Sequence, residues 1–204
     1  MPTNVLYGKR ENVINACLSL PKKSGINTFI DLFCGIGGFH IAASKLGLKC
    51  LYASDIDEEA RKAYSHNFEI MPEGDIVKVD AKDIPDHDLL CAGFPCQPFS
   101  IIGKRKGFSD PRGTMFFEIV RILKEKKPKA FMLENVRQLA TTEGGKVIND
   151  MKNTLEKLGY FVDYKILNAL NFGLPQKRER VLIIGTRQEI GKFPWPEKKV
   201  EMKP

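Results

Sequence analysis

Residues 27–47 read NTFIDLFCGIGGFHIAASKLG, and this stretch decides the fold class. The run NTFIDLF is apolar and continuous, as in a strand that is buried on both faces. A glycine turn follows, and the next residues, FHIAASKLG, have the spacing of a helix. A buried strand, a glycine turn and a helix in this order indicate the first unit of an α/β sheet.

The same alternation continues along the chain. Strands are predicted at residues 49–55, 74–79, 87–94 and 129–136, and helices at 58–68, 114–127 and 145–159. Apolar strands separated by helices indicate a parallel sheet that is covered on both faces. The last two strands, 160–169 and 180–187, are joined by a short loop without a helix. Because such a loop cannot make a parallel crossover, we expect an antiparallel pair at the sheet edge.

Length and composition fit one globular domain, with at most a small appendage. The chain has 204 residues, of which 43% are hydrophobic and 28% charged, so it can bury a substantial core. No apolar run approaches the roughly 18 residues of a transmembrane helix, and the amino terminus lacks the order of a signal peptide. These features predict a cytosolic protein. A formal net charge of +7 favours a polyanionic partner, although a basic solvated surface explains it almost as well.

Cysteine usage points to one residue. The five cysteines follow no C-x-x-C spacing and the three histidines form no metal-ligand pair, so we expect reduced thiols and no metal site. Cys96 lies in CAGFPCQPFS, residues 91–100, beyond the apolar run that ends at Gly93. Pro95 and Pro98 restrict the backbone of this loop and would hold the thiol in one place. Cys96 is therefore a candidate nucleophile, and the alternative is an inert thiol.

The glycine turn is expected at the carboxyl edge of the sheet, where ligands of this fold bind. A dinucleotide fingerprint would need a third glycine at the position of His40, which weakens a pyrophosphate site. Asp55 ends the next strand and could accept hydrogen bonds from ribose hydroxyls, and Asp75 could face an adenine amino group. Glycines with two acids suit a nucleoside that carries a positive sulfonium, such as S-adenosylmethionine. The alternative is a tight turn beside two solvated aspartates.

Further polar groups are expected at the same edge. Glu134 follows the apolar residues AFML at the end of a strand, a position that suits it to hold or donate a proton. Gln176, Arg178 and Arg180 are two residues apart, so an extended chain places all three on one face. Such a face could grip a phosphate or a carbonyl by forked hydrogen bonds, and the alternative is an ordinary charged strand start.

Taken in order, these motifs resemble those of the DNA (cytosine-5) methyltransferases. The matching stretches are FIDLFCGIGGF, GDI, CAGFPCQPFS, RGTMFFEI, MLENV and LNFGLPQKRERV. The resemblance covers about residues 26–187 and is nearest to the HhaI-type bacterial modification enzymes. It implies a Rossmann-like α/β fold that depends on S-adenosylmethionine, with a mostly parallel sheet and an antiparallel pair at its edge. The catalytic domain is then expected at residues 26–190.

The resemblance also implies a reaction, namely methyl transfer to carbon 5 of a cytosine that is flipped out of duplex DNA. Cys96 would attack carbon 6 of the base, and Glu134 would bind and protonate ring nitrogen 3. Arg178 and Arg180 would hold the base carbonyl, and no metal is needed. Cofactor binding is implied for Phe33, Gly35, Gly38, Asp55, Ile56, Asp75, Ile76, Pro95 and Met115. Substrate binding is implied for Gln97, Ser100, Asn135, Val136 and Gln176.

The chain departs from the family pattern at its ends. Enzymes of this family continue into a target-recognition domain, and we interpret residues 191–204 as a charged, proline-containing tail where that domain would begin. One interpretation is a split enzyme with a second protein chain, and another is a truncated product. Residues 1–25 are interpreted as a helical segment, because ENVINACLSLP resembles the closing helix of the family, moved by circular permutation. Any amphipathic leading helix would look similar.

The sequence leaves two other functions open. An RNA cytosine methyltransferase would use the same chemistry, since substrate choice would reside largely outside this region. A non-catalytic DNA-binding or assembly module could retain the fold, although a binder has no need of a placed thiol. For the DNA enzyme, we expect a bacterial cytoplasmic location in contact with the nucleoid.

Overall fold

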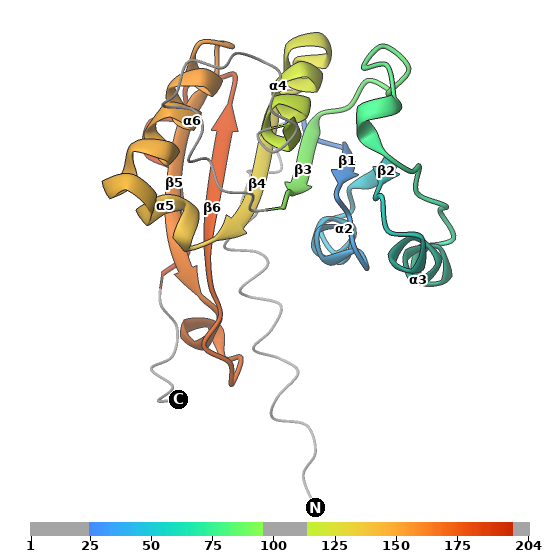
Figure 1. Cartoon of the computed structure of the whole chain (residues 1–204), viewed down its shortest axis with the longest axis horizontal. Helices are drawn as coiled ribbons and strands as arrows, with labels where there is room; N and C mark the ends of the chain where they lie inside the picture. Colours follow the sequence, from blue (N-terminus) through green and yellow to red (C-terminus); the bar gives the residue numbers. More distant parts are fainter. Residues whose placement is uncertain (1–24, 96–113, 198–204) are drawn as a thin grey trace, which may run out of the picture.

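The computed structural model describes residues 25–95 and 114–197 (Figure 1). Within these ranges six strands form one sheet in the order β2-β1-β3-β4-β6-β5. The strands are β1 (Thr28–Leu32), β2 (Lys49–Ser54), β3 (Leu89–Gly93), β4 (Ala130–Val136), β5 (Phe161–Asn168) and β6 (Glu179–Thr186). The α-helices are α2 (Gly38–Ser44), α3 (Glu58–Phe68), α4 (Thr114–Lys126), α5 (Gln138–Thr141) and α6 (Lys146–Glu156), and short 3-10 helices cover Ile76–Lys78, Thr142–Gly145 and Ala169–Phe172.

The predicted mixture of strand directions is confirmed. Strands β2, β1, β3 and β4 are mutually parallel, whereas β6 runs antiparallel to β4 and β5 runs antiparallel to β6. The order of the strands across the sheet can be followed in Figure 1. Because the parallel strands all end at one edge, the segments after β1, β2, β3 and β4 meet there.

Apolar side chains cover the two sheet faces unequally. On one face, α4, α5 and α6 pack on β1, β3, β4 and β6 to form the largest core, which contains Leu90, Phe131 and Ile183. On the other face a smaller core lies around β1 and β3, where Ala43 of α2 packs with Phe29. Both cores are built from the alternate residues of the same strands, as a two-sided sheet requires.

Our prediction of a strand at residues 74–79 is wrong. Glu73 forms a single bridge to Ser54, and the chain then enters the 3-10 helix Ile76–Lys78. An Asp75 carboxylate oxygen accepts a hydrogen bond from the Val77 amide at 3.1 Å. This local bond offers the backbone an alternative to strand pairing, and the Ile76 side chain turns into the core.

The glycine turn requires glycine at one position in particular. Gly37 has φ +93°, and a Cβ there would collide with the ring of Phe68. That ring also stacks on His40 with 3.9 Å between the ring centres. His40 bonds to the Tyr64 hydroxyl through Nδ1 at 2.6 Å, and burial lowers the His40 pKa. The residue that replaces the third glycine of a dinucleotide fingerprint is therefore a core residue.

Residues near the carboxyl end of the described chain return to the sheet. Trp195 donates a hydrogen bond from Nε1 to Asp163 Oδ2 on β5 at 2.6 Å, and Phe193 and Pro196 are buried. Of the helices in the two described ranges, none is long and apolar enough to cross a membrane.

Candidate active site

The ends of β3, β4 and β6 bring together an acid, an arginine and a glycine. Gly93 pairs with Glu134 across β3 and β4, and Glu134 Oε1 lies 2.7 Å from Arg180 Nε of β6. The two side chains keep 28% and 25% of their surface exposed, so a ligand can still reach them. A Cβ at Gly93 would lie 3.8 Å from Glu134 Oε2, so glycine leaves the space beside the carboxylate open.

Asn135 ties the loop after β3 to β4. Its side chain is only 2% exposed, and its Nδ2 donates a hydrogen bond to the Phe94 carbonyl at 3.0 Å. Its Oδ1 accepts a hydrogen bond from the Val136 amide at 2.8 Å. Both polar ends of a residue that we predicted to contact substrate are thus bonded to the protein backbone. The backbone just before the Pro95–Cys96 pair is thereby held against the strand that carries Glu134.

Three of the predicted site residues, Cys96, Gln97 and Ser100, lie outside the described residues. Pro95 is the last residue described before them, and its side chain is exposed. Phe94 directly before it is 3% exposed and belongs to the main core. The chain therefore leaves the core at Pro95, one residue before the predicted nucleophile.

The arginine segment is only partly extended. Strand β6 begins at Glu179, and Gln176 lies in a bend in which its amide donates to the Leu174 carbonyl at 2.8 Å. Gln176 and Arg178 are exposed, whereas Arg180 is half-buried and also donates from Nη1 to the Glu179 carbonyl at 2.9 Å. The bend at Gln176 therefore interrupts the extended segment that we predicted would place Gln176, Arg178 and Arg180 on one face.

One ion pair at this end was not predicted. Arg137 Nη1 lies 2.9 Å from Glu179 Oε2, which links the residue after β4 to the first residue of β6. Arg137 directly follows the ENV triplet, but no local pattern identifies its partner. The contact depends on the antiparallel pairing of β4 with β6, in which Val136 lies opposite Arg180.

The glycine turn and the end of β2 are joined by a carboxylate. Asp55 Oδ2 accepts a hydrogen bond from the Gly35 amide at 2.8 Å, and Oδ1 accepts one from the Asp57 amide at 2.9 Å. Phe33, just before the turn, is half-buried and has a left-handed φ of 54°. No heavy atom lies within 4 Å of a Cβ built on Gly35, so this side of the turn is open.

The other predicted cofactor residues differ in exposure. Ile56 is 76% exposed next to Asp55, whereas the Ile76 side chain is 3% exposed and packs in the main core. Gly38 begins α2 and has open space above its backbone, and Met115 is half-buried against the main core. The backbone at Ile76 is held by Arg121 of α4, whose Nη2 donates to the Ile76 carbonyl at 3.1 Å. The sequence did not reveal this contact.

The described cysteines are unsuited to nucleophilic attack. Burial raises the pKa of Cys34, Cys50 and Cys91, and all three are buried free thiols. They are therefore protonated at neutral pH, which removes the thiolate that attacks. Among residues 25–95 and 114–197, no group of three or more His, Cys, Asp or Glu side chains could hold a metal ion.

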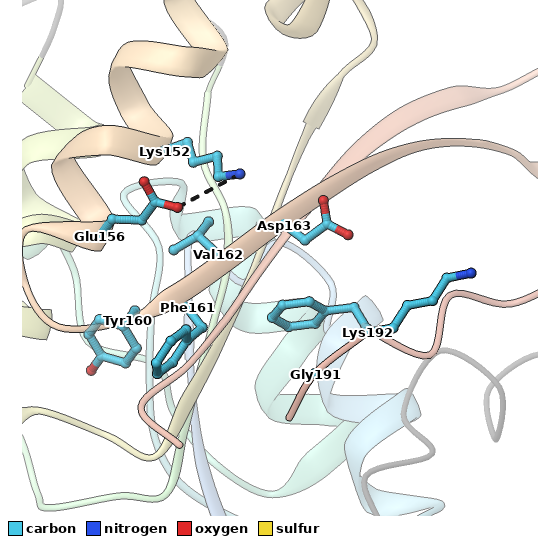
Figure 2. A pocket seen from close by; sticks show the side chains of 9 residues that line it. Lys152, Glu156, Tyr160, Phe161, Val162, Asp163, Gly191 and Lys192 are labelled. Atoms are coloured by element: carbon cyan, nitrogen blue, oxygen red, sulfur yellow. Dashed lines mark ion pairs between the residues drawn. The ribbon is translucent and has the colours of Figure 1, made fainter. Parts of the chain in front are cut away.

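A cavity of about 520 Å³ lies at the opposite end of the strands (Figure 2). Lys152 and Glu156 of α6, which form an ion pair at 3.7 Å, line it together with the first residues of β5. Phe161 pairs with Thr186, which pairs with Ala130 at the amino end of β4. The cavity is thus remote from Glu134, and none of the predicted site residues lines it.

Comparison with known proteins places the chain in a family. Residues 27–204 match the family model described as C-5 cytosine-specific DNA methylase. The type II methyltransferase M.HhaI of Haemophilus parahaemolyticus is 51% identical over 172 residues, which cover 82% of this chain and 53% of that protein. The type II methyltransferase M.NgoBI of Neisseria gonorrhoeae is 54% identical over 168 residues, with the same coverage.

Solved structures agree with the fold. The crystal structure of the Dnmt2 methyltransferase of S. pombe has a TM-score of 0.69 and 29% sequence identity, over 82% of this chain and 53% of that one. The chain spans about half the length of the curated relatives named above. With the family model matched over residues 27–204, the chain belongs to the C-5 cytosine-specific DNA methylase family.

Proposed function

We propose that this chain carries the catalytic part of a methyltransferase that modifies carbon 5 of cytosine in duplex DNA, within a restriction-modification system. The observation that carries the proposal is the contact between Glu134 and Arg180, next to Asn135, whose side chain holds the Phe94 carbonyl just after β3. An acid, a guanidinium and an anchored loop that leads to Cys96 are the parts that this chemistry needs. Family membership supports the same reaction.

The residues at the glycine turn fit S-adenosylmethionine. The turn is open above Gly35 and Gly38, and each Asp55 oxygen accepts one backbone amide, so lone pairs are left for ribose hydroxyls. The exposed Ile56 offers an apolar surface for the adenine ring, with Phe33 and Met115 as neighbours in the proposed pocket. Asp75 would face the adenine amine, and Pro95 would lie between the two ligands. When bound, this cofactor supplies an electrophilic methyl group.

The side chains of this protein would prepare the base. Cytosine carbon 5 is too electron-poor to be methylated directly. The Cys96 thiolate would form a bond to carbon 6 while Glu134 delivers a proton to ring nitrogen 3, which converts the ring to an enamine that is nucleophilic at carbon 5. Arg178 and Arg180 would hold the base carbonyl by charge-assisted hydrogen bonds. Loss of the carbon-5 proton to solvent after methylation would break the sulfur–carbon bond and return the thiolate, and ring nitrogen 3 would give its proton back to Glu134.

The base has to leave the helix to reach these groups. Flipping costs a few kcal/mol of unpairing and unstacking, which contacts to the extruded base and the DNA backbone must offset. The net charge of +7 supports binding to a polyanion. Gln97, Ser100, Val136 and Gln176 are proposed as further contacts to the substrate.

The part of the relatives that this chain does not match would read the DNA sequence. We propose that the chain works with a second polypeptide that supplies the remainder, as in a split enzyme. A longer form of the same protein, in which one chain carries both halves, is the alternative.

The test is transfer of labelled methyl from S-adenosylmethionine to unmodified duplex DNA and, in parallel, to structured RNA. Each assay compares the chain with Cys96→Ser and with Cys17→Ser as a matched thiol control, with and without a chain that carries the remaining half. We expect Cys96-dependent transfer to DNA that requires or is strongly increased by the second chain. Methyl transfer to RNA but not to DNA would show that the substrate is RNA. Bound cofactor without transfer to either polymer would overturn the proposed activity.

A further inference from the structure

One sheet face has an apolar strip that the described helices leave partly uncovered. Leu182 and Ile184 of β6 point to the face opposite α4, α5 and α6 and are partly exposed. In the strand register they lie beside Glu134 and Met132 of β4. Neither Leu182 nor Ile184 belongs to the apolar cores of the described residues. A sheet face of this kind normally packs against a second layer.

The strip is bounded on both sides. Helix α2 packs over β1 and β3 on one side, where it forms the smaller core with Phe29. On the other side Trp195 lies against Asp163 of β5, directly opposite Ile184 in the register. Phe161, at the start of β5 on the same face, remains 44% exposed. The missing cover therefore has to fit between α2 and the Trp195 segment.

The amino-terminal part of the chain joins the described residues next to this strip. The Gly25 carbonyl accepts a hydrogen bond from Lys129 Nζ at 2.6 Å, and the Lys129 carbonyl accepts one from the Arg187 amide at 2.9 Å. Gly25 is thus held where β4 begins and β6 ends. Ile26 packs into the smaller core with Ala130, on the same face as Leu182 and Ile184. The 24 residues before Gly25 begin at the border of the uncovered strip.

Residues 11–20 have the pattern of an amphipathic helix, which could cover the strip. With helical spacing, Val13, Ile14, Cys17 and Leu18 fall on one side, with Glu11 at its border, and Asn12, Asn15 and Ser19 fall on the other. A ten-residue helix is about 15 Å long. Along β4 the strip extends from Ala130 to Glu134, which lies opposite Leu182. At the usual rise of a strand its length is about 14 Å. A linker of about five residues can span up to roughly 17 Å, enough to reach it.

We infer that residues 11–20 form a helix that packs its apolar side on Leu182 and Ile184. Tethering favours this segment over a second copy, because a short linker gives it a millimolar effective concentration. Leu182 lies opposite Glu134 in the register, so the helix borders the Glu134–Arg180 pair and shields it from water. The inference concerns the fold of the chain and does not depend on the proposed reaction.

The experiment is disulfide formation between the natural Cys17 and Ile184→Cys in the full chain, in a Cys96→Ser background under a mild oxidant. Ile166→Cys is the matched control, because Ile166 is 36% exposed and pairs with Val181, whose side chain belongs to the opposite face. We expect an internal disulfide between Cys17 and the thiol introduced at position 184 in a monomer, and little bonding at position 166. A disulfide-linked dimer at position 184 would show that a second copy covers the strip. Equal bonding at the two positions would also overturn the inference.

A second measurement decides the case if no bond forms at either position. Val13→Asp with Leu18→Asp should raise the fluorescence of a dye that binds exposed apolar surface several-fold, because the strip is uncovered. Asn12→Asp with Ser19→Asp adds the same charge on the polar side and should leave the fluorescence unchanged. Equal dye binding by the two double variants would overturn the inference, whatever the result of the disulfide test.

Discussion

Arg180 reaches back along the sheet to meet Glu134. In the β4–β6 register Val136 lies opposite Arg180, yet the Arg180 Nε is 2.7 Å from Glu134 Oε1, two residues further into β4. The guanidinium is also bonded through Nη1 to the Glu179 carbonyl, which leaves its remaining N–H groups for a ligand. Because the acid and the arginine are in contact, a change at either residue alters the electrostatic environment of the other.

Replacing Glu134 by Gln should lower methyl transfer by about 100-fold or more, the usual contribution of a positioned proton donor. Gln keeps the shape but cannot deliver a proton to the base. S-adenosylmethionine affinity should be unchanged, since the glycine turn is not altered. The measurement is steady-state transfer beside cofactor titration, with exposed Glu125→Gln on α4 as the control. A Glu134→Gln variant with more than half of the original rate would exclude Glu134 as the proton donor.

Replacing Asn135 by Asp should release the loop that carries Cys96. The ionised carboxylate of this variant cannot donate to the Phe94 carbonyl, and an unpaired buried carbonyl costs about 1–3 kcal/mol. We expect a loss of transfer of at least tenfold with retained cofactor binding. The alkylation rate of Cys96 should also change, because the effect acts through the position of the thiol. An unchanged alkylation rate with the same loss of transfer would show that Asn135 acts on the substrate instead.

Replacing Asp55 by Asn should weaken cofactor binding by about 10- to 100-fold, since hydrogen bonds to a charged acceptor contribute about 1.5–3 kcal/mol. Asn also has one acceptor oxygen for the two amides of Gly35 and Asp57. Asp57→Asn is the matched control, because Asp57 caps α3 by accepting from the Glu59 and Ala60 amides and Asn caps as well as Asp. Calorimetric titration with S-adenosylmethionine measures both. If Asp55→Asn and Asp57→Asn bind S-adenosylmethionine with equal affinity, Asp55 does not bind the cofactor.

Local patterns were sufficient to predict most of the elements of this fold. Helix α3 begins and ends where predicted, because Asp57 caps it and Glu69 ends it in a left-handed conformation. The antiparallel pair β5–β6 was predicted because the connection is too short for a crossover helix. The prediction of a strand at 74–79 failed because the Asp75 carboxylate accepts a hydrogen bond from the Val77 amide and starts a 3-10 helix. Short apolar segments do not reveal such side-chain competition.

The candidate site was predictable residue by residue but not as a set of contacts. Glu134 was singled out from its place at a strand end, and Arg180 from its two-residue spacing with Gln176 and Arg178. Their 2.7 Å contact depends on the register of strands that are far apart in the sequence, and no local pattern specifies it. For the same reason the bond between Asn135 and the Phe94 carbonyl was not predicted.

Replacing Gly37 by Ala should destabilise the fold by about 2–4 kcal/mol. The residue has φ +93°, and an added Cβ would collide with the Phe68 ring, so both backbone strain and overpacking contribute. Gly38→Ala is the matched control, since no atom lies within 4 Å of its Cβ and it begins a helix. Chemical denaturation of the two variants gives the difference. A loss below about 0.5 kcal/mol for Gly37→Ala would mean that the turn relaxes freely.

Asp88 should make stability depend on pH in the acid range. Burial alone would raise its pKa, but Lys129 and the N–H and O–H donors of Asn27 and Thr28 outweigh burial and lower the pKa to about 2. The carboxylate lies 2.8 Å from Lys129 Nζ and accepts the Asn27 amide at 2.8 Å. Since the folded pKa lies below the unfolded value, this contribution is present above about pH 4 and is lost as the pH falls through 2.

Replacing Asp88 by Asn should therefore cost about 1–2 kcal/mol at pH 7, a range that allows for the exposure of Lys129. The difference from the unchanged chain should shrink between pH 4 and pH 2, where the carboxylate of the folded chain becomes protonated. Asp86→Asn is the control, because the Asp86 side chain is 94% exposed and its pair with Lys126 should contribute less than about 0.5 kcal/mol. Denaturant unfolding at pH 7, 4 and 2 measures the free energy of unfolding of each variant and of the unchanged chain. A difference for Asp88→Asn that stays constant from pH 7 to pH 2 would show that the carboxylate stabilises the β1–β3 end by shape and not by charge.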